Sequence, residues 1–160
     1  MKWLPEAFKP QPSMPLISLS NVSKSYREPA SGLEVPVLKS VNLQIEAGES
    51  VAIVGPSGCG KSTLLNILGT LDMPDSGEHL FDGELVSTMQ AAQLADLRSR
   101  KIGFIFQLHH LMPQCSVLEN VLLPTLALPG AGAADAKKRA EVLLSQVGLQ
   151  DRLAWKPAQL

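Results

Sequence analysis

The stretch Gly55-Pro56-Ser57-Gly58-Cys59-Gly60-Lys61-Ser62, followed by Thr63, decides the fold of this chain. It fits the pattern G-x-x-x-x-G-K-[ST], in which backbone N–H groups point inward around phosphate oxygens. Residues 50–54 (SVAIV) before it are apolar and mostly β-branched, which predicts a short strand buried on both faces. Residues 64–72 (LLNILGTLD) after it have helical character. A strand, a glycine-rich loop and a helix in this order predict a phosphate-binding loop.

Each residue type in the loop has a chemical task. Gly58 and Gly60 permit the backbone conformations that form the nest, and the helix beginning near Lys61 adds the positive end of its dipole. The Lys61 ammonium is expected at the β- and γ-phosphates, the Ser62 hydroxyl at Mg²⁺, and Thr63 at the α-phosphate. A chance glycine-rich turn is the alternative, and the flanking strand and helix argue against it. The predicted nucleotide site consists of Gly55, Pro56, Ser57, Gly58, Cys59, Gly60, Lys61, Ser62 and Thr63.

Composition narrows the protein class. The chain has 160 residues, which is the length of about one domain. Its 14 Lys and Arg against 15 Asp and Glu give a net charge of −1, which does not suggest a nucleic-acid partner. No apolar run reaches the ~18–20 residues of a membrane-spanning helix. Cys59 and Cys115 match no zinc or redox spacing, and Cys59 is interpreted as a small packing residue rather than a nucleophile.

The remaining pattern predicts an α/β domain whose N-terminal part is antiparallel. Residues 1–15 contain four prolines and are expected to form an irregular lead-in. A first strand is expected at 16–28, with a bend or bulge, and a second at 37–45. A pair of short strands is expected at 77–86, turning at Asp82-Gly83, and a strand buried on both faces at 102–106. The helices are expected at 91–100, at 117–128, interrupted at Pro124, and at 134–147, with Ala140, Leu143, Leu144 and Val147 on one face and Gly148 after its end.

An acid that could complete a hydrolytic site is missing from this pattern. A phosphate-binding loop that cleaves phosphate needs a carboxylate at the end of a buried strand to hold the magnesium shell. Residues 102–106 end at Gln107, which is an amide. Asp82 belongs to a predicted turn, and Asp72 follows a helix rather than a strand. The residues therefore predict nucleotide binding, and hydrolysis does not follow from them.

Three motifs in order resemble the nucleotide-binding domain of ABC transporters over about residues 16–160: Tyr26 in VSKSYR, the loop at 55–63, and Phe104-Ile105-Phe106-Gln107. The resemblance implies that Tyr26 stacks on adenine, where the alternative is an ordinary half-buried strand tyrosine. It also implies that Gln107 reaches Mg²⁺ or the attacking water, where the alternative is a polar strand end. The implied cofactors are ATP and Mg²⁺, with Ser62 and Gln107 as candidate metal ligands.

Residues 106–113 (FQLHHLMP) and 118–121 (LENV) are similar to the subfamily that releases lipoproteins and to its relatives in macrolide export. The resemblance implies an ATP-binding subunit that couples ATP binding, and in a complete chain hydrolysis, to transport. The implied partners are transmembrane permease subunits, contacted through Gln107 to Asn120, and a second nucleotide-binding subunit. The implied location is peripheral, on the cytoplasmic side of the bacterial inner membrane.

Family members continue past a segment like 156–160 into a Leu-Ser-Gly-Gly-Gln signature, a magnesium-holding Asp, a catalytic Glu and a switch His. None of these occurs in the 160 residues, so no catalytic residue is assigned and ATPase activity is left open. We therefore expect a P-loop NTPase fold of the ABC type, C-terminally incomplete, with a partial nucleotide-binding domain at 16–160. One alternative is a truncated fragment that binds nucleotide without hydrolysing it. Another is a small P-loop kinase, which would need an Arg-rich lid that the sequence does not show.

Overall fold

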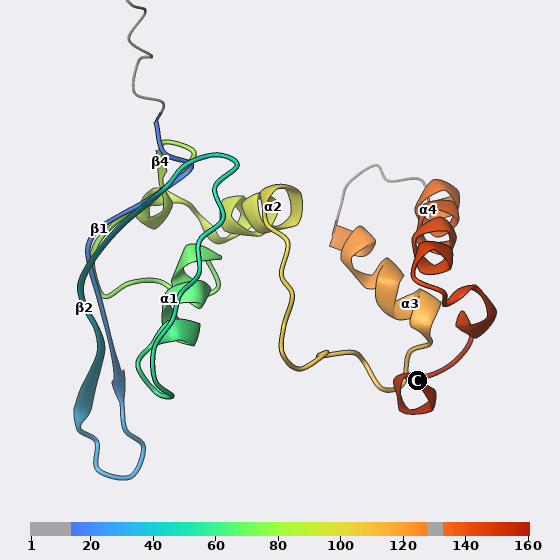
Figure 1. Ribbon diagram of the computed structural model, residues 1–160, viewed down its shortest axis with the longest axis horizontal. Helices are drawn as coiled ribbons and strands as arrows, with labels where there is room; N and C mark the ends of the chain where they lie inside the picture. Colours follow the sequence, from blue (N-terminus) through green and yellow to red (C-terminus); the bar gives the residue numbers. More distant parts are fainter. Residues whose placement is uncertain (1–13, 128–132) are drawn as a thin grey trace, which may run out of the picture. The chain divides into compact units, whose positions relative to one another are not determined.

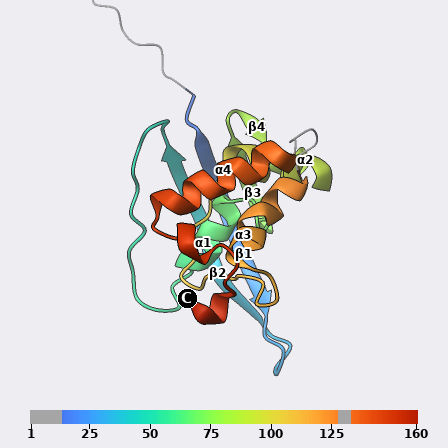
Figure 2. The same ribbon diagram turned by 90° about the vertical axis from the view of Figure 1, so that its right-hand side faces the viewer.

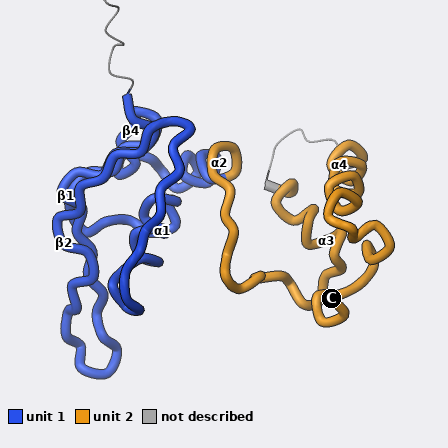
Figure 3. Tube along the Cα trace, in the orientation of Figure 1, with its two compact units in different colours: residues 1–98 blue, residues 99–160 orange. Residues whose placement is uncertain are grey.

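The computed structural model describes residues 14–127 and 133–160. Most of the expected lead-in at 1–15 therefore lies outside the described residues. The chain divides into two compact units, residues 1–98 and residues 99–160 (Figure 3).

The first unit contains a four-stranded antiparallel sheet, whose strands β1 and β2 are blue to teal and whose strand β4 is yellow-green in Figure 1. Its strands are β1 (Ile17–Arg27), β2 (Glu34–Ile45), β3 (Ser76–Phe81) and β4 (Glu84–Leu85), in the order β2-β1-β3-β4. The predicted antiparallel group is thus confirmed. Because β2 lies at the edge of the sheet, it tolerates Pro36, which has no N–H to give to a second neighbour.

Local sequence signals account for the irregular points of this sheet. The register of β1 against β2 shifts between Leu19 and Val22, which confirms the predicted bulge. Strand β2 starts at Glu34, earlier than the predicted residue 37, because Tyr26 pairs with Val35 and extends the hairpin. Asp82 and Gly83 join β3 to β4 and both have positive φ (52° and 80°), as a two-residue type I′ turn requires.

The core of the first unit lies between this sheet and helix α1 (Lys61–Leu68). Alternation along the strands turns apolar side chains toward the helix, and removing them from water stabilises the unit. The buried residues of this core are Leu19, Val22, Leu38, Ile67 and Leu68. The helix ends at Gly69, whose N–H bonds to the Leu65 carbonyl.

Two segments predicted as buried strands are not strands. Residues 50–54 and 102–106 have no ladder partner in the described parts of the chain. Val54 is 86% exposed and Ile105 is fully exposed. A strand buried on both faces needs paired neighbours and a covering layer, and an apolar, β-branched sequence supplies neither by itself. The two strand predictions are therefore wrong for this structure.

Helix α2 (Ala91–Lys101) confirms the predicted amphipathic helix and runs across the boundary between the two units. In the second unit, α3 (Val117–Leu122) continues into a 3₁₀ turn, Leu123–Ala127, where Pro124 interrupts the α-helix as predicted. Helix α4 (Ala133–Gln146) lies beside α3 (Figures 1 and 2). None of the helices in the described residues is long and apolar enough to cross a membrane.

The apolar face of α4 is narrower than predicted. Ala140 and Leu144, one turn apart, are buried. Leu143 and Val147 are 47% and 69% exposed, so only part of the predicted apolar face is buried. Gly148 follows the helix with a positive φ of 74°, as predicted for the residue that ends it.

Candidate nucleotide-binding site

The glycine-rich loop ends in a backbone conformation that suits glycine. Gly60 caps α1 with φ of 93°, in the left-handed region. A Cβ atom at Gly60 would lie 3.0 Å from Leu38 Cδ2 and 3.0 Å from Val37 Cγ1. The end of the loop therefore packs directly against β2, and a side chain at this position would push it away.

Lys61 folds back over the loop that precedes it. Its ammonium donates hydrogen bonds to the carbonyl oxygens of Gly55, at 2.9 Å, and Pro56, at 2.6 Å. The Cys59 sulfur lies 3.8 Å from the same nitrogen. A compact positive charge thus stands where the loop and the N-terminus of α1 meet, which is the combination that attracts phosphate.

The two predicted magnesium ligands, Ser62 and Gln107, belong to different units. Ser62 lies exposed in the first turn of α1, next to the loop. One hydroxyl fits a Mg²⁺ ion that keeps several waters and takes its other oxygens from phosphate. No group of three His, Cys, Asp or Glu side chains is placed to hold a metal within residues 14–127 and 133–160. Gln107 belongs to the second unit and is exposed, so its role as a ligand stays a prediction.

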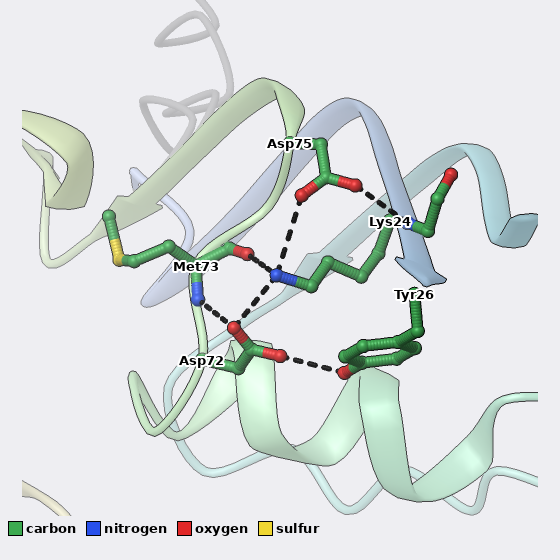
Figure 4. Close-up of polar contacts among 6 residues, drawn as sticks. Lys24, Tyr26, Asp72, Met73 and Asp75 are labelled. Carbon is green, nitrogen blue, oxygen red and sulfur yellow. Dashed lines mark hydrogen bonds and ion pairs between the residues drawn. The ribbon is translucent and has the colours of Figure 1, made fainter. Parts of the chain in front are cut away.

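Tyr26 lies near the end of β1 and is 41% exposed. Its hydroxyl donates a hydrogen bond of 2.7 Å to Asp72 Oδ2 (Figure 4). The structure therefore links the predicted base-stacking residue to Asp72, a few residues after the helix that begins at the predicted phosphate site.

A cluster of charged residues around Tyr26 was missed in the sequence (Figure 4). The Lys24 ammonium donates to Asp72 Oδ1, at 2.8 Å, and to the Met73 carbonyl, at 2.7 Å. Asp75 Oδ1 lies 3.4 Å from the same nitrogen. The available signal was weak: Lys24 precedes Tyr26 by two positions on one strand, and the two acids follow α1 only a few residues before β3.

The pKa values of this cluster reflect the mutual contacts. The hydrogen bond to Asp72, and then burial, raise the pKa of Tyr26. Burial alone would raise the pKa of Asp72, but the bonds it accepts from Lys24, Tyr26 and the Met73 N–H outweigh burial and lower the pKa. The bond to Asp72 raises the pKa of Lys24 against partial burial. Asp72 is therefore ionised and Lys24 protonated at neutral pH.

Stacked rings at residues 104–110 and one amide organise the chain before and within the region from Gln107 to Asn120, which was predicted to contact a membrane partner. The Phe104 and Phe106 rings stack with centroids 5.5 Å apart, and the His110 ring meets the Phe106 ring edge-on at 5.1 Å. Asn120 accepts a hydrogen bond from the Met112 N–H at 2.8 Å and donates to three carbonyls in the loop before α3. The segment is ordered around these contacts within the second unit.

Comparison with known sequences gives a consistent result. Residues 38–160 match the family described as ABC transporter. The chain is 48% identical over 148 residues to the lipoprotein-releasing system ATP-binding protein LolD of Saccharophagus degradans, covering 92% of this chain and 64% of that protein. It is 51% identical over 146 residues to the macrolide export ATP-binding/permease protein MacB of Wolinella succinogenes, covering 91% of this chain and 22% of that protein.

Solved structures agree with the sequences. The ATP-binding cassette MJ0796, solved as a dimer in a post-hydrolysis state with ADP and Pi, matches with a TM-score of 0.79 and 42% identity over 90% of this chain. The chain spans 62% of that structure and less than two thirds of the two relatives above. The expected α/β P-loop fold of the ABC type is confirmed by this likeness. Because the family match covers most of its length, this chain belongs to the ABC transporter family.

Proposed function

We propose that this chain is the nucleotide-binding part of the ATP-binding subunit of an ABC exporter of the lipoprotein-releasing type. The observation that carries the proposal is the loop before α1, where Gly60 closes the turn against β2 and the Lys61 ammonium stands over the loop carbonyls. Such a loop suits the phosphates of a nucleotide, because N–H groups, a helix dipole and a cation converge on it. The sequence relatives named as ATP-binding proteins support the choice of ATP.

Each proposed ligand contact uses a residue type suited to it. Residues 55–63 enclose the phosphates, with Lys61 at the β- and γ-phosphates and Thr63 at the α-phosphate. Ser62, through its hydroxyl, and Gln107 are the proposed ligands that would hold Mg²⁺, which would neutralise charge on the phosphate oxygens. Tyr26 stacks on the adenine, which is supported by its aromatic ring and its 41% exposure.

The proposed partners are a pair of transmembrane permease subunits and a second nucleotide-binding subunit. The permease contact is assigned to the region from Gln107 to Asn120, where Leu108 is 69% exposed and Met112 is 43% exposed. The solved relative MJ0796 was observed as a dimer, which supports the second assignment. The proposed location is peripheral, on the cytoplasmic side of the bacterial inner membrane.

Nucleotide binding by this chain does not imply hydrolysis. No side chain of the 160 residues is assigned as a catalytic base, so we expect the chain to bind ATP without steady-state release of phosphate. Purified chain incubated with ATP and Mg²⁺ and assayed for inorganic phosphate checks this expectation. Multiple turnovers, abolished by Lys61→Ala, would instead show that this chain is itself an ATPase.

Calorimetric titration with ATP and Mg²⁺ tests the binding site. Lys61→Ala is expected to weaken binding about tenfold or more, equivalent to ~1.4 kcal/mol. Lys39→Ala is the matched control, because Lys39 is an exposed lysine on β2. Unchanged affinity in Lys61→Ala, or an equal loss in both variants, would contradict the assignment of the loop.

A further inference from the structure

We propose that Asp72 is a positioning residue for the base: it holds the Tyr26 ring in place relative to the phosphate loop. The inference rests on the proposed function, in which Tyr26 stacks on adenine. It adds a residue outside the loop that lies 46 positions from Tyr26 in sequence and accepts its hydroxyl proton in a 2.7 Å hydrogen bond.

Both oxygens of the Asp72 carboxylate are used. Oδ2 accepts from the Tyr26 hydroxyl, and Oδ1 accepts from Lys24 and from the Met73 N–H, at 2.8 Å each (Figure 4). A carboxylate engaged at both oxygens does not rotate freely. The tyrosine ring, anchored at its hydroxyl and at its Cα on β1, is therefore held at two ends.

The backbone at Asp72 is fixed by the helix that begins at the phosphate loop. The N–H groups of Leu71 and Asp72 both donate to the Asn66 carbonyl, at 2.8 and 3.2 Å. The Thr70 N–H donates to Ile67, and the Thr70 carbonyl accepts from the Arg98 guanidinium at 3.0 Å. The phosphate loop, α1, Asp72 and Tyr26 thus form one short connected path within the first unit.

Lys24 neutralises the charge of the Asp72 carboxylate. Its side chain is 12% exposed, and its ammonium pairs with Asp72 at 2.8 Å. A partly buried carboxylate without this cation would carry an uncompensated charge beside the base site. Asp75 supports Lys24 from the other side and accepts from the Ser25 N–H at 2.6 Å, but it does not contact Tyr26. Asp75 is therefore a control for charge and packing in the same cluster.

Holding the ring ready for a ligand improves affinity, because the entropy of ordering a side chain is then lost before binding. The benefit should apply only to ligands that carry a base. We expect Tyr26→Phe and Asp72→Ala to weaken ATP binding about fivefold. Binding of inorganic tripolyphosphate with Mg²⁺, which has phosphates but no base, should be unchanged in both.

Calorimetric titration of the full chain with the two probes gives distinct outcomes. The Asp75→Ala variant is expected to bind ATP and tripolyphosphate with the same affinities as the unsubstituted chain. Unchanged ATP affinity in Tyr26→Phe would overturn the positioning role even if Asp72→Ala failed to fold. Equal losses of ATP and tripolyphosphate in Asp72→Ala would also overturn it, because Asp72 would then act on the loop. Failure of the unsubstituted chain to bind either probe, or unchanged ATP binding in Tyr26→Ala, would instead contradict the proposed function.

A second measurement tests the contact without any nucleotide. Tyr26 is the single tyrosine of the chain, so the absorbance of tyrosinate on alkaline titration reports this residue alone. The bond to Asp72 raises the pKa of Tyr26, so the midpoint in Asp72→Ala should move to lower pH. Asp75→Ala should leave it in place. An unshifted midpoint in Asp72→Ala would overturn the inferred contact.

Discussion

The two units are stabilised in different ways. The first buries apolar side chains between a sheet and a helix, whereas in the second side-chain hydrogen bonds join a loop to a helix. In the first unit, the core joins three elements that are far apart in sequence, β1, β2 and α1. In the second, the buried apolar side chains within the described residues are Val117, Ala140 and Leu144. Asn120 alone makes four hydrogen bonds to the backbone of residues 112–116.

This difference indicates which substitutions should destabilise each unit most. A packed core is sensitive to volume and to close backbone approach, because neighbouring atoms have no room to move. A loop held by an amide is sensitive to the loss of one donor or acceptor, because the partners are left unpaired. The near-ultraviolet dichroism of Tyr26 reports the first unit. In a Trp3→Phe background, the fluorescence of Trp155 reports the second.

The largest effect is expected from Gly77→Ala in β3. Gly77 has φ of 88°, and a Cβ there would lie 2.4 Å from the Asn21 carbonyl oxygen on β1, so the two strands would have to separate. We expect a loss of about 4 kcal/mol in the unfolding free energy of the first unit. Denaturant unfolding followed at Tyr26 measures it. Gly48→Ala is the control, since it has similar φ and nothing within 4 Å, and it should cost about 1 kcal/mol. Equal losses in the two variants would contradict the steric explanation.

A pH-dependent effect of about 3 kcal/mol is expected from His79. It is 2% exposed, neither ring nitrogen has a hydrogen-bond partner in the described structure, and burial lowers its pKa from 6.5 to about 4. Between these pH values the unfolded chain binds a proton that the folded chain does not, so stability falls as the pH decreases, by about 3 kcal/mol in total.

His79→Leu should abolish that part of the pH dependence. It should also stabilise the first unit by about 1 kcal/mol at neutral pH, because it removes two unpaired buried nitrogens. Unfolding of both proteins at a series of pH values, followed at Tyr26, measures the slope. The same slope in His79→Leu would show that another group titrates.

In the second unit, Asn120→Ala should cost about 2 kcal/mol, because the Met112 N–H loses its acceptor and the Cys115 carbonyl loses its donor. Unfolding followed at Trp155 measures the loss, and the signal of Tyr26 should not change. Gln114→Ala, at an exposed position in the same loop, is the control. A loss confined to the Tyr26 signal would contradict the division of roles between the units.

The smallest effect is expected from Ser116→Ala, about 1 kcal/mol at the N-terminus of α3. Ser116 and Glu119 form a reciprocal capping box, with bonds of 2.7 and 3.2 Å. The backbone bond from Ser116, followed by its side-chain bond, lowers the pKa of Glu119, so this pKa should rise in the variant. Unfolding at Trp155 and carboxyl titration by NMR measure the two effects, with Ser145→Ala on α4 as the control. An unchanged Glu119 pKa would show that the Ser116 side chain does not lower it, since the backbone N–H is kept in the variant.

Short-range signals accounted for much of this fold. The loop at 55–62, the turn at Asp82-Gly83 and helix α4 each depend on residues within a few positions, and each was predicted from sequence. The strand predictions at 50–54 and 102–106 failed, because a buried strand depends on partners that a local pattern does not contain.

In the candidate nucleotide-binding site, too, local features were predicted and contacts between distant residues were not. Tyr26 and the loop could be selected from sequence, since a family motif marks both. The contact from Tyr26 to Asp72 spans 46 positions, and its formation depends on how β1 passes the end of α1. The exposure of Leu143 was missed for a related reason: periodicity gives the apolar side of a helix, while the width of the buried face is set by the neighbouring element.

The folded-back Lys61 has a consequence for selectivity among anions. Its ammonium already donates to the carbonyls of Gly55 and Pro56, so any anion must replace two good hydrogen bonds before it gains this cation. A single-charged anion offers little in exchange, whereas a polyphosphate offers several oxygens to the ammonium and to the surrounding N–H groups at once. Under the proposed function, the two carbonyls therefore compete with the anion for the Lys61 ammonium, and a polyphosphate should bind more readily than a singly charged anion.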